Sequence, residues 1–246
     1  MVVKTASDGT GDTLHIFATG SVTGPLRRAA QAFVLLSEDT SFEFTAAGAR
    51  KLLPRMLEWQ EGDLILGGAE EVMDSAIIFG CVIGLTIRPI GARDSAILVP
   101  NGNPAAVSSL EDLTRDDVRV GVAKQGSLQG VWEAVALRAG MFEDIRGRIT
   151  EVSTGSSDLM GTLARREVDA AIGWASSALL APERIETVPI EPKWCTWRTT
   201  SIGITPWTEN RPLAEEFIKF NRSPEGLEIW HKFGWKPLKD AKVGGK

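Results

Sequence analysis

The chain has 246 residues, of which 43% are hydrophobic and 24% are charged, and its formal net charge is −5. This length suits one large α/β domain or two lobes of ordinary size. The average composition excludes a disordered or fibrous protein, and the negative charge excludes the overall basic field that nucleic-acid binders direct at phosphates. We therefore expect a globular protein without a nucleic-acid partner.

No segment of the chain has the pattern of a membrane span. The longest apolar stretch, residues 75–85, is much shorter than the roughly 20 residues that a spanning helix needs. The polar, Gly-rich stretch 4–13 also lacks the basic and then apolar order of an export signal. We expect residues 1–13 and 239–246 to be flexible ends.

The predicted elements of the first half alternate short apolar runs with amphipathic stretches. Leu26, Ala29, Ala30 and Phe33 recur at helical spacing after a first apolar run. This alternation is typical of βαβ units and of a mainly parallel sheet. In chain order we expect a strand at 14–18, a helix through 26–33, a strand at 41–45, a helix at 50–59, a strand at 63–66 and a helix at 70–81.

The alternation begins again after an extended segment at 94–99 and a turn at 100–104. The expected elements are strands at 118–123, 149–152 and 170–174, helices at 130–139 and 158–166, an extended segment at 199–204 and closing helices at 212–221 and 224–233. Two βα units joined by two extended crossings indicate two lobes with a double-stranded hinge. A single continuous doubly wound sheet fits the pattern nearly as well.

The two cysteines, Cys81 and Cys195, are too few for a disulfide framework and lack the spacing of a metal or redox site. We expect two buried thiols, although the sequence leaves a disulfide between them open.

Specific stretches along nearly the whole chain resemble the molybdate- and tungstate-binding proteins of ABC importers. They are an opening strand with a Ser-containing turn (LHIFATGSVT, 14–23), an acidic strand and helix (DLILGGAEEVMD, 63–74), a hinge strand, turn and helix start (DSAILVPNGNP, 94–104, and SLEDL, 109–113), a later strand (EVDAAIGW, 167–174) and a closing helix (SPEGLEIWHKFG, 223–234).

The resemblance implies an α/β, two-lobed periplasmic-binding-protein type II fold with a double-crossover hinge. Its lobes would be formed by residues 14–97 with 201–238 and by residues 98–200. It further implies a monomeric, extracytoplasmic solute-binding protein, its signal peptide removed, that binds a small molybdate- or tungstate-like oxyanion in the interlobe cleft. The expected partner is the membrane permease of an ABC transporter, and no cofactor is expected.

Helix starts suit a tetrahedral anion because their free N–H groups and the macrodipole favour negative charge. We expect ligand donors at four such starts and at one strand end: Thr19, Gly20 and Ser21; Gly48, Ala49 and Arg50; Gln129 and Gly130; Ser156 and Ser157; and Trp174. Each place has an ordinary structural alternative, namely a helix cap, a solvated arginine, a plain loop or a core aromatic residue.

Three of these residues can be compared individually with the residues that are usual in the family. Ser21 matches a ligand-binding serine, and Trp174 occupies the place of a tyrosine hydroxyl. Arg50 departs from the small hydroxyl residues that are usual at its place, and a guanidinium can bind an anion through two hydrogen bonds. The alternative ligand is therefore a small organic carboxylate or other anion held by Arg50.

Other functions have little support in the sequence. The chain contains no tyrosine, which excludes the tyrosinate pairs with which related binding proteins hold ferric iron. His15 and His231 are isolated and lack metal-ligand spacing. Nucleophile, P-loop and dinucleotide motifs are absent from the sequence, and an enzyme on the same fold would have only Asp158 or Glu133 as a nearby acid or base. We therefore expect a binding protein and not an enzyme.

Overall fold

The computed structural model describes residues 2–5, 12–37 and 39–241. The chain forms two compact units. The first contains the residues up to Ala92 and Thr199–Leu238, and the second contains Arg93–Arg198 together with residues 239–241. Strands β5 (Arg88–Pro100) and β10 (Trp197–Ile204) each run from one unit into the other. The alternation of helices and strands confirms the expected α/β class.

The ends of the chain were expected to be flexible at 1–13 and 239–246. Residues 1, 6–11 and 242–246 of these stretches lie outside the described residues. Within the first stretch, strand β1 (Val2–Thr5) pairs antiparallel with β3, Val2 lying opposite Thr45. Strand β2 begins at Asp12, so part of this stretch belongs to the sheet.

The sheet of the first unit has the strand order β1, β3, β2, β4, β10. Strand β2 (Asp12–Thr19) lies parallel to both β3 (Thr40–Ala47) and β4 (Leu64–Gly67). Strand β10 closes this order by antiparallel pairing with β4. Three parallel strands therefore end at one edge of the sheet, which we call the carboxyl edge of the first unit.

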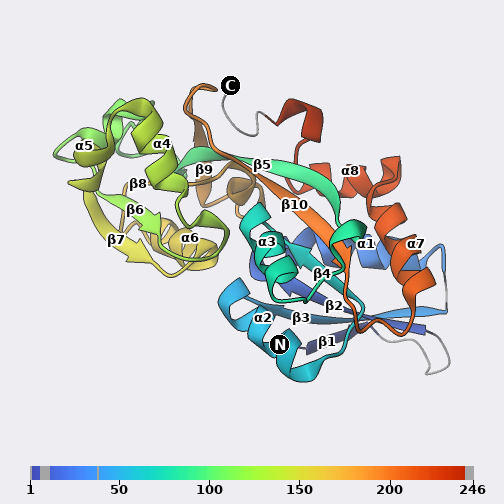
Figure 1. The fold of residues 1–246 in the computed structure, drawn as a ribbon. Coiled ribbons are helices and arrows are strands. Elements are labelled where there is room, and N and C mark those ends of the chain that lie inside the picture. Colours follow the sequence, from blue (N-terminus) through green and yellow to red (C-terminus); the bar gives the residue numbers. More distant parts are fainter. Residues whose placement is uncertain (1, 6–11, 38, 242–246) are drawn as a thin grey trace. The chain divides into compact units, whose positions relative to one another are not determined.

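Helices cover both faces of this sheet (Figure 1). Leu14 and Ile16 of β2 pack toward α1 (Thr23–Val34), α7 (Arg211–Asn221) and α8 (Pro224–Lys232). Phe17, the residue after Ile16, lies on the opposite face and packs toward α2 (Ala49–Trp59) and α3 (Glu70–Ile78). Side chains of a strand alternate between faces, so a fully buried strand is apolar at nearly every position.

Helix α3 is shorter than the predicted helix 70–81 because glycine ends it. Gly80 adopts a φ of 68°, in the left-handed region that stops a helix. The N–H of Cys81 then bonds to the carbonyl of Ala76, which closes the last turn.

The sheet of the second unit has the order β5, β8, β6, β7, and β9 (Ile185–Pro189) pairs with β5. Strand β6 (Val120–Ala123) is parallel to β7 (Ile149–Ser153) and to β8 (Ala170–Trp174). The ends of these three strands form the carboxyl edge of the second unit.

One apolar core fills the second unit. Leu159 and Leu163 of α6 (Ser156–Ala164) and Val131 and Val135 of α4 (Val131–Ala139) are fully buried against the sheet. Helix α5 (Phe142–Arg146) is one short turn beyond α4. Short 3-10 segments complete the described elements of the chain: η1 (Gly20–Val22), η2 (Gly84–Thr86), η3 (Glu111–Thr114), η4 (Gly126–Leu128), η5 (Ala175–Leu180) and η6 (Leu238–Asp240).

Both cysteines are buried free thiols, as predicted, Cys81 in the first unit and Cys195 in the second.

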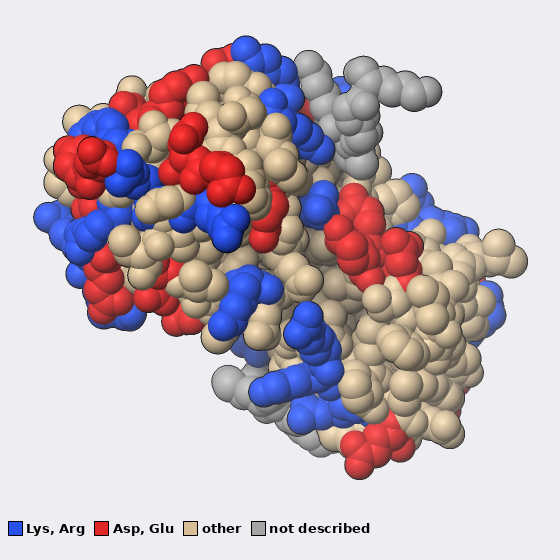
Figure 2. Space-filling model, turned by 60° about the vertical axis from the view of Figure 1, so that its left-hand side comes forward, with Lys and Arg blue, Asp and Glu red and all other residues tan. Residues whose placement is uncertain are grey.

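Among the described helices, none combines the length and the apolar character that a membrane crossing requires. On the face drawn in Figure 2, acidic and basic side chains are intermixed. Some exposed charges pair with each other, as Arg165 and Glu167 do at 2.6 Å.

Candidate functional site

The predicted residues of the first unit lie together at its carboxyl edge. Thr19 ends β2 and is paired in register with Ala47, which ends β3. Gly20 and Ser21 follow in η1, whereas Gly48 caps α2 and Ala49 begins it. The two predicted segments, 19–21 and 48–50, therefore lie at neighbouring strand ends.

The hydroxyl of Thr19 is held by a backbone group from a third strand end. The N–H of Gly68, just beyond β4, donates to Thr19 Oγ1 at 3.0 Å, and Thr19 is only 7% exposed. Because Oγ1 accepts this bond, the hydroxyl hydrogen of Thr19 can still be donated. The described residues offer this hydrogen no acceptor.

Arg50 lies in the first turn of α2, where backbone N–H groups have no partner inside the helix. Its side chain is exposed, and no carboxylate of the described residues pairs with it. Gly48 caps the helix without a side-chain hydrogen bond. This helix start therefore combines a positive side chain with free backbone donors, as anion binding requires.

The predicted residues of the second unit also meet at its carboxyl edge. Gln129 and Gly130 immediately precede α4, Ser156 and Ser157 begin α6, and Trp174 ends β8. Gly130 has a φ of 73°, which favours glycine at this turn. The three places lie beyond β6, β7 and β8, and they come together because these strands are parallel neighbours.

Trp174 is buried, and its indole N–H is bonded within the protein. Its side chain is 0% exposed, and its indole Nε1–H donates to Ser127 Oγ at 3.0 Å. The guanidinium of Arg93, itself 2% exposed, lies 4.9 Å from the ring centroid of Trp174. The one polar hydrogen of the indole is thus committed to Ser127, a residue that the sequence did not single out because nothing in its spacing links it to Trp174.

Carboxylates also lie at these edges, and backbone N–H groups hold two of them, Asp158 and Glu70. Asp158 accepts from the N–H of Thr154 at 2.9 Å, and this bond, with one from the Thr154 hydroxyl, lowers the pKa of Asp158. Glu70 accepts from the N–H of Thr199 at 2.7 Å. Asp158 is therefore held as an ionised carboxylate in the first turn of α6.

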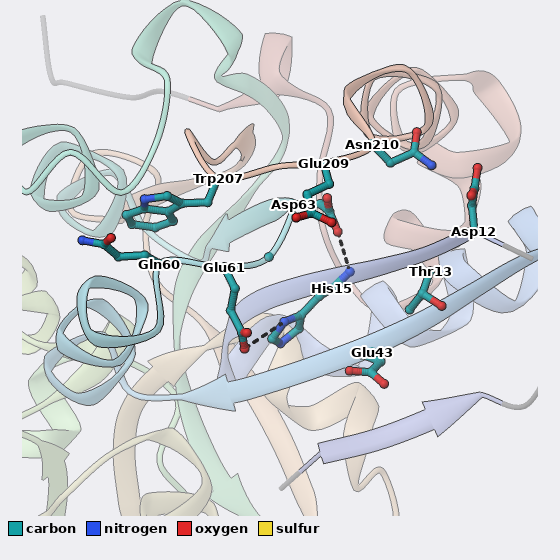
Figure 3. A pocket seen from close by; sticks show the side chains of 11 residues that line it. Asp12, Thr13, His15, Glu43, Gln60, Glu61, Asp63, Trp207, Glu209 and Asn210 are labelled. Carbon is teal, nitrogen blue, oxygen red and sulfur yellow. Dashed lines mark hydrogen bonds and ion pairs between the residues drawn. The ribbon is translucent and has the colours of Figure 1, made fainter.

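A hollow of about 590 Å³ opens at the opposite end of the strands of the first unit (Figure 3). Its lining comes from the start of β2, from β3, from the loop before β4 and from the loop before α7, and contains none of the predicted site residues. The lining residues are Asp12, Thr13, His15, Glu43, Gln60, Glu61, Gly62, Asp63, Trp207, Glu209 and Asn210.

Two polar residues of this hollow, Asp63 and His15, make hydrogen bonds to each other and to neighbouring residues. Asp63 accepts from the backbone N–H of His15 at 2.8 Å and from the hydroxyl of Thr208 at 2.7 Å. The ring of His15 bonds to Thr45 through Nε2 at 2.8 Å and lies 4.0 Å from Glu61 through Nδ1. Within the part of the chain that the structure describes, no group of His, Cys, Asp or Glu side chains is arranged to hold a metal ion.

The fold is that of the periplasmic-binding proteins of type II. Residues 14–236 match the family described as bacterial extracellular solute-binding protein. The chain belongs to this family. No curated protein sequence matches the chain.

Solved structures support the fold over nearly the whole chain. The substrate-binding domain of a putative molybdenum ABC transporter from Clostridium difficile is 15% identical and has a TM-score of 0.77, with 92% of this chain and 99% of that one covered. PEB3 from Campylobacter jejuni, solved with L-phospholactate bound, is 22% identical with a TM-score of 0.78 and coverage of 91% and 99%. The sulfate-binding protein SubI from Mycobacterium tuberculosis is 13% identical with a TM-score of 0.78 and coverage of 93% and 88%.

These identities are all low, and the named ligands differ from one another. The comparisons therefore establish the fold and the solute-binding family, while the ligand has to be argued from the residues of this chain.

Proposed function

We propose that the protein is the extracytoplasmic binding component of an ABC importer and that it captures a small anion with the residues of its two carboxyl edges. The anion is a molybdate-, tungstate- or sulfate-like oxyanion. The residues that bind it are those that the sequence predicts, with segments 19–21 and 48–50 contributed by the first unit and Gln129, Gly130, Ser156 and Ser157 by the second.

One observation carries this proposal: each predicted segment lies where a parallel strand gives way to a helix or a 3-10 turn. Ligands of α/β folds bind beyond the carboxyl ends of parallel strands. Helices α2, α4 and α6 begin at these places, and their first-turn N–H groups favour negative charge. Three helices that each begin just after a parallel strand support an anion site at these strand ends.

The number of donors is consistent with micromolar binding. A hydrogen bond to a charged group contributes about 1.5–3 kcal/mol, so about five such bonds contribute roughly 7.5–15 kcal/mol in total. Micromolar binding needs about 8 kcal/mol after the cost of association has been met, which requires bonds near the upper end of this range. Thr19 and Arg50 add one hydroxyl and one positive charge to the backbone groups of the first unit.

The test of this proposal is a thermal-shift series with sodium tungstate, molybdate and sulfate, with sodium chloride at equal ionic strength as the reference. At a hundredfold excess over Kd, binding stabilises the folded state by about 2.7 kcal/mol, which raises the Tm of a chain of this size by about 5–10 °C. If no oxyanion raises the Tm above the chloride reference, the oxyanion proposal is wrong.

A second candidate ligand is a small organic anion with a carboxylate or phosphate group. Arg50 supports it, because an exposed guanidinium without a carboxylate partner can bind such a group through two parallel hydrogen bonds. The phospholactate bound to PEB3 is an anion of this chemistry.

The two candidates differ in their dependence on Arg50. We expect Arg50→Gln to abolish binding of an organic acid such as L-phospholactate, and to weaken oxyanion binding without abolishing it. The matched control is Arg28→Gln, because Arg28 is exposed on α1 and its removal lowers the net charge equally. Calorimetric titration of both variants distinguishes a specific contact from a general effect of charge.

A further inference from the structure

Trp174 and Ser127 form a pair whose hydrogen-bond direction is determined by chemistry. An indole nitrogen is only a donor, and Trp174 Nε1 lies 3.0 Å from Ser127 Oγ. Ser127 Oγ must therefore accept this bond. A serine hydroxyl carries a single hydrogen, so that hydrogen is directed to another partner.

The described residues provide no such partner for Ser127. Its side chain is half-buried, and the bond from Trp174 is the one hydrogen bond that its hydroxyl makes in the described part of the chain. Ser127 lies in η4, two residues before Gln129 and close in sequence to the start of α4. Its free hydroxyl hydrogen thus belongs to the carboxyl edge of the second unit.

Trp174 is held rigidly enough to orient this hydroxyl. Its backbone pairs with Ser95 of β5, its ring has no exposed surface, and the guanidinium of Arg93 covers one side of the ring at 4.9 Å. A buried side chain with two packed neighbours has little rotamer freedom. The orientation of Ser127 Oγ therefore follows from the position of the indole.

We propose that Ser127 is a ligand-binding hydroxyl, which donates a hydrogen bond to an anionic oxygen of the ligand, and that Trp174 is a positioning residue that acts through Ser127. This inference rests on the proposed function, in which the carboxyl edge of the second unit binds an anion. It adds a side-chain donor to an edge that otherwise supplies mainly backbone donors. It also removes Trp174 from direct contact with the ligand.

The first experiment measures binding of sodium tungstate, molybdate and sulfate to the full chain by calorimetric titration. Ser127→Ala removes the hydroxyl, and we expect the affinity to fall about tenfold or more, as for a lost hydrogen bond to a charged group. Ser127→Thr retains a hydroxyl and restores most of that affinity. Ser109→Ala, a half-buried serine elsewhere in the second unit, leaves the affinity unchanged.

The second experiment tests whether Trp174 acts through Ser127. Trp174→Phe keeps a ring beneath Arg93 but removes the N–H, so it lowers the affinity of the wild-type chain. In the Ser127→Ala background the same change has no further effect, since the hydroxyl that the indole orients is already absent. An equal loss in both backgrounds would mean a purely structural role for Trp174 and would overturn the positioning role.

A second buried tryptophan provides a control that distinguishes a loss of ligand affinity from a loss of stability. Trp230 is also fully buried and donates to Asn221 at 3.0 Å, in the first unit. We expect Trp230→Phe to lower the Tm while the affinity is retained. If Trp174→Phe does not fold, the comparison of Ser127→Ala with Ser127→Thr still decides the role of the hydroxyl.

The outcomes distinguish this inference from the proposed function. If the wild-type chain binds none of the three oxyanions, both are overturned. If the wild-type chain binds one of them and Ser127→Ala binds it equally well, the role of Ser127 is wrong and the proposed function stands.

Discussion

Individual side chains of this protein often have their roles decided by a partner far away in the sequence. Ser127 and Trp174 are 47 residues apart, and Thr19 and Gly68 are 49 apart. In both pairs an N–H donates to a hydroxyl oxygen, which leaves the hydroxyl hydrogen available. Sequence spacing cannot reveal such a pair, because the two partners belong to different strands or loops that meet only in the folded sheet.

His15 shows the same dependence on its surroundings, and it leads to a pH prediction. Burial lowers its pKa from the ordinary value of 6.5, against weaker raising effects of Glu61, Glu43 and Asp63. The folded state therefore binds the proton less tightly than the unfolded state does. The stability that neutral His15 contributes is present above pH 6.5 and is lost as the pH falls through that value toward the lower folded pKa.

The prediction is tested by denaturant unfolding of His15→Gln. We expect the difference in unfolding free energy between the wild type and this variant to shrink from neutral to mildly acidic pH. His231→Gln, at an exposed position of α8, is the control that leaves the pH profile of the wild type in place. A constant difference for His15→Gln across this range would contradict the assignment.

At the scale of elements, the closing helix α8 shows how a local motif leads to a specific structure. The hydroxyl of Ser223 accepts from the N–H of Gly226 at 3.1 Å, and Pro224 is the first helical residue. At Gly226 a Cβ atom would collide with the carbonyl oxygen of Phe220, so the close contact with the end of α7 requires glycine. The stretch SPEG thus begins the helix and also allows it to pack closely against the end of α7.

We expect Ser223→Ala to lower the free energy of unfolding by about 1 kcal/mol, the usual loss for an N-cap, and the Tm by about 2–4 °C. The control is Ser75→Ala, because Ser75 is a half-buried residue inside α3 whose hydroxyl donates to the carbonyl of Glu71. That change should stay within about 0.5 kcal/mol of the wild type. Equal losses in both variants would show that the cap contributes nothing particular.

The elements that sequence periodicity missed are short or lie at an edge. Strand β9 has only Ile185 buried, so it lacks a clear alternating pattern. Helix α5 has five residues, too few for a helical period to be visible. Strand β1 owes its existence to its pairing with β3. Their formation depends on neighbours and not on local propensity.

At the scale of the molecule, the chain contains two units that each have a core of their own. Leu26 is fully buried in the core of the first unit and Leu159 in that of the second. A unit with its own core can lose structure without the other.

We expect Leu159→Ala to cost about 2–5 kcal/mol and to lower hydrogen-exchange protection in β6 and α4 while β2 stays protected. Leu26→Ala is the matched variant. We expect it to lower hydrogen-exchange protection in β2 while β6 and α4 stay protected. Loss of protection throughout both units in either variant would indicate that the chain unfolds as one cooperative whole.

The sequence by itself determined the α/β class and most of the order of strands and helices, because apolar periodicity and turn residues act locally. The resemblance of its motifs to known binding proteins indicated the solute-binding family. The sequence also located the helix starts at which the candidate residues lie. The tertiary structure decided which contacts each of these residues makes. Parallel pairing brings separate segments to one edge of each sheet, and side-chain packing buries Trp174 against Arg93 and commits its indole hydrogen to Ser127. Such contacts depend on the packing of distant segments, which no local pattern records.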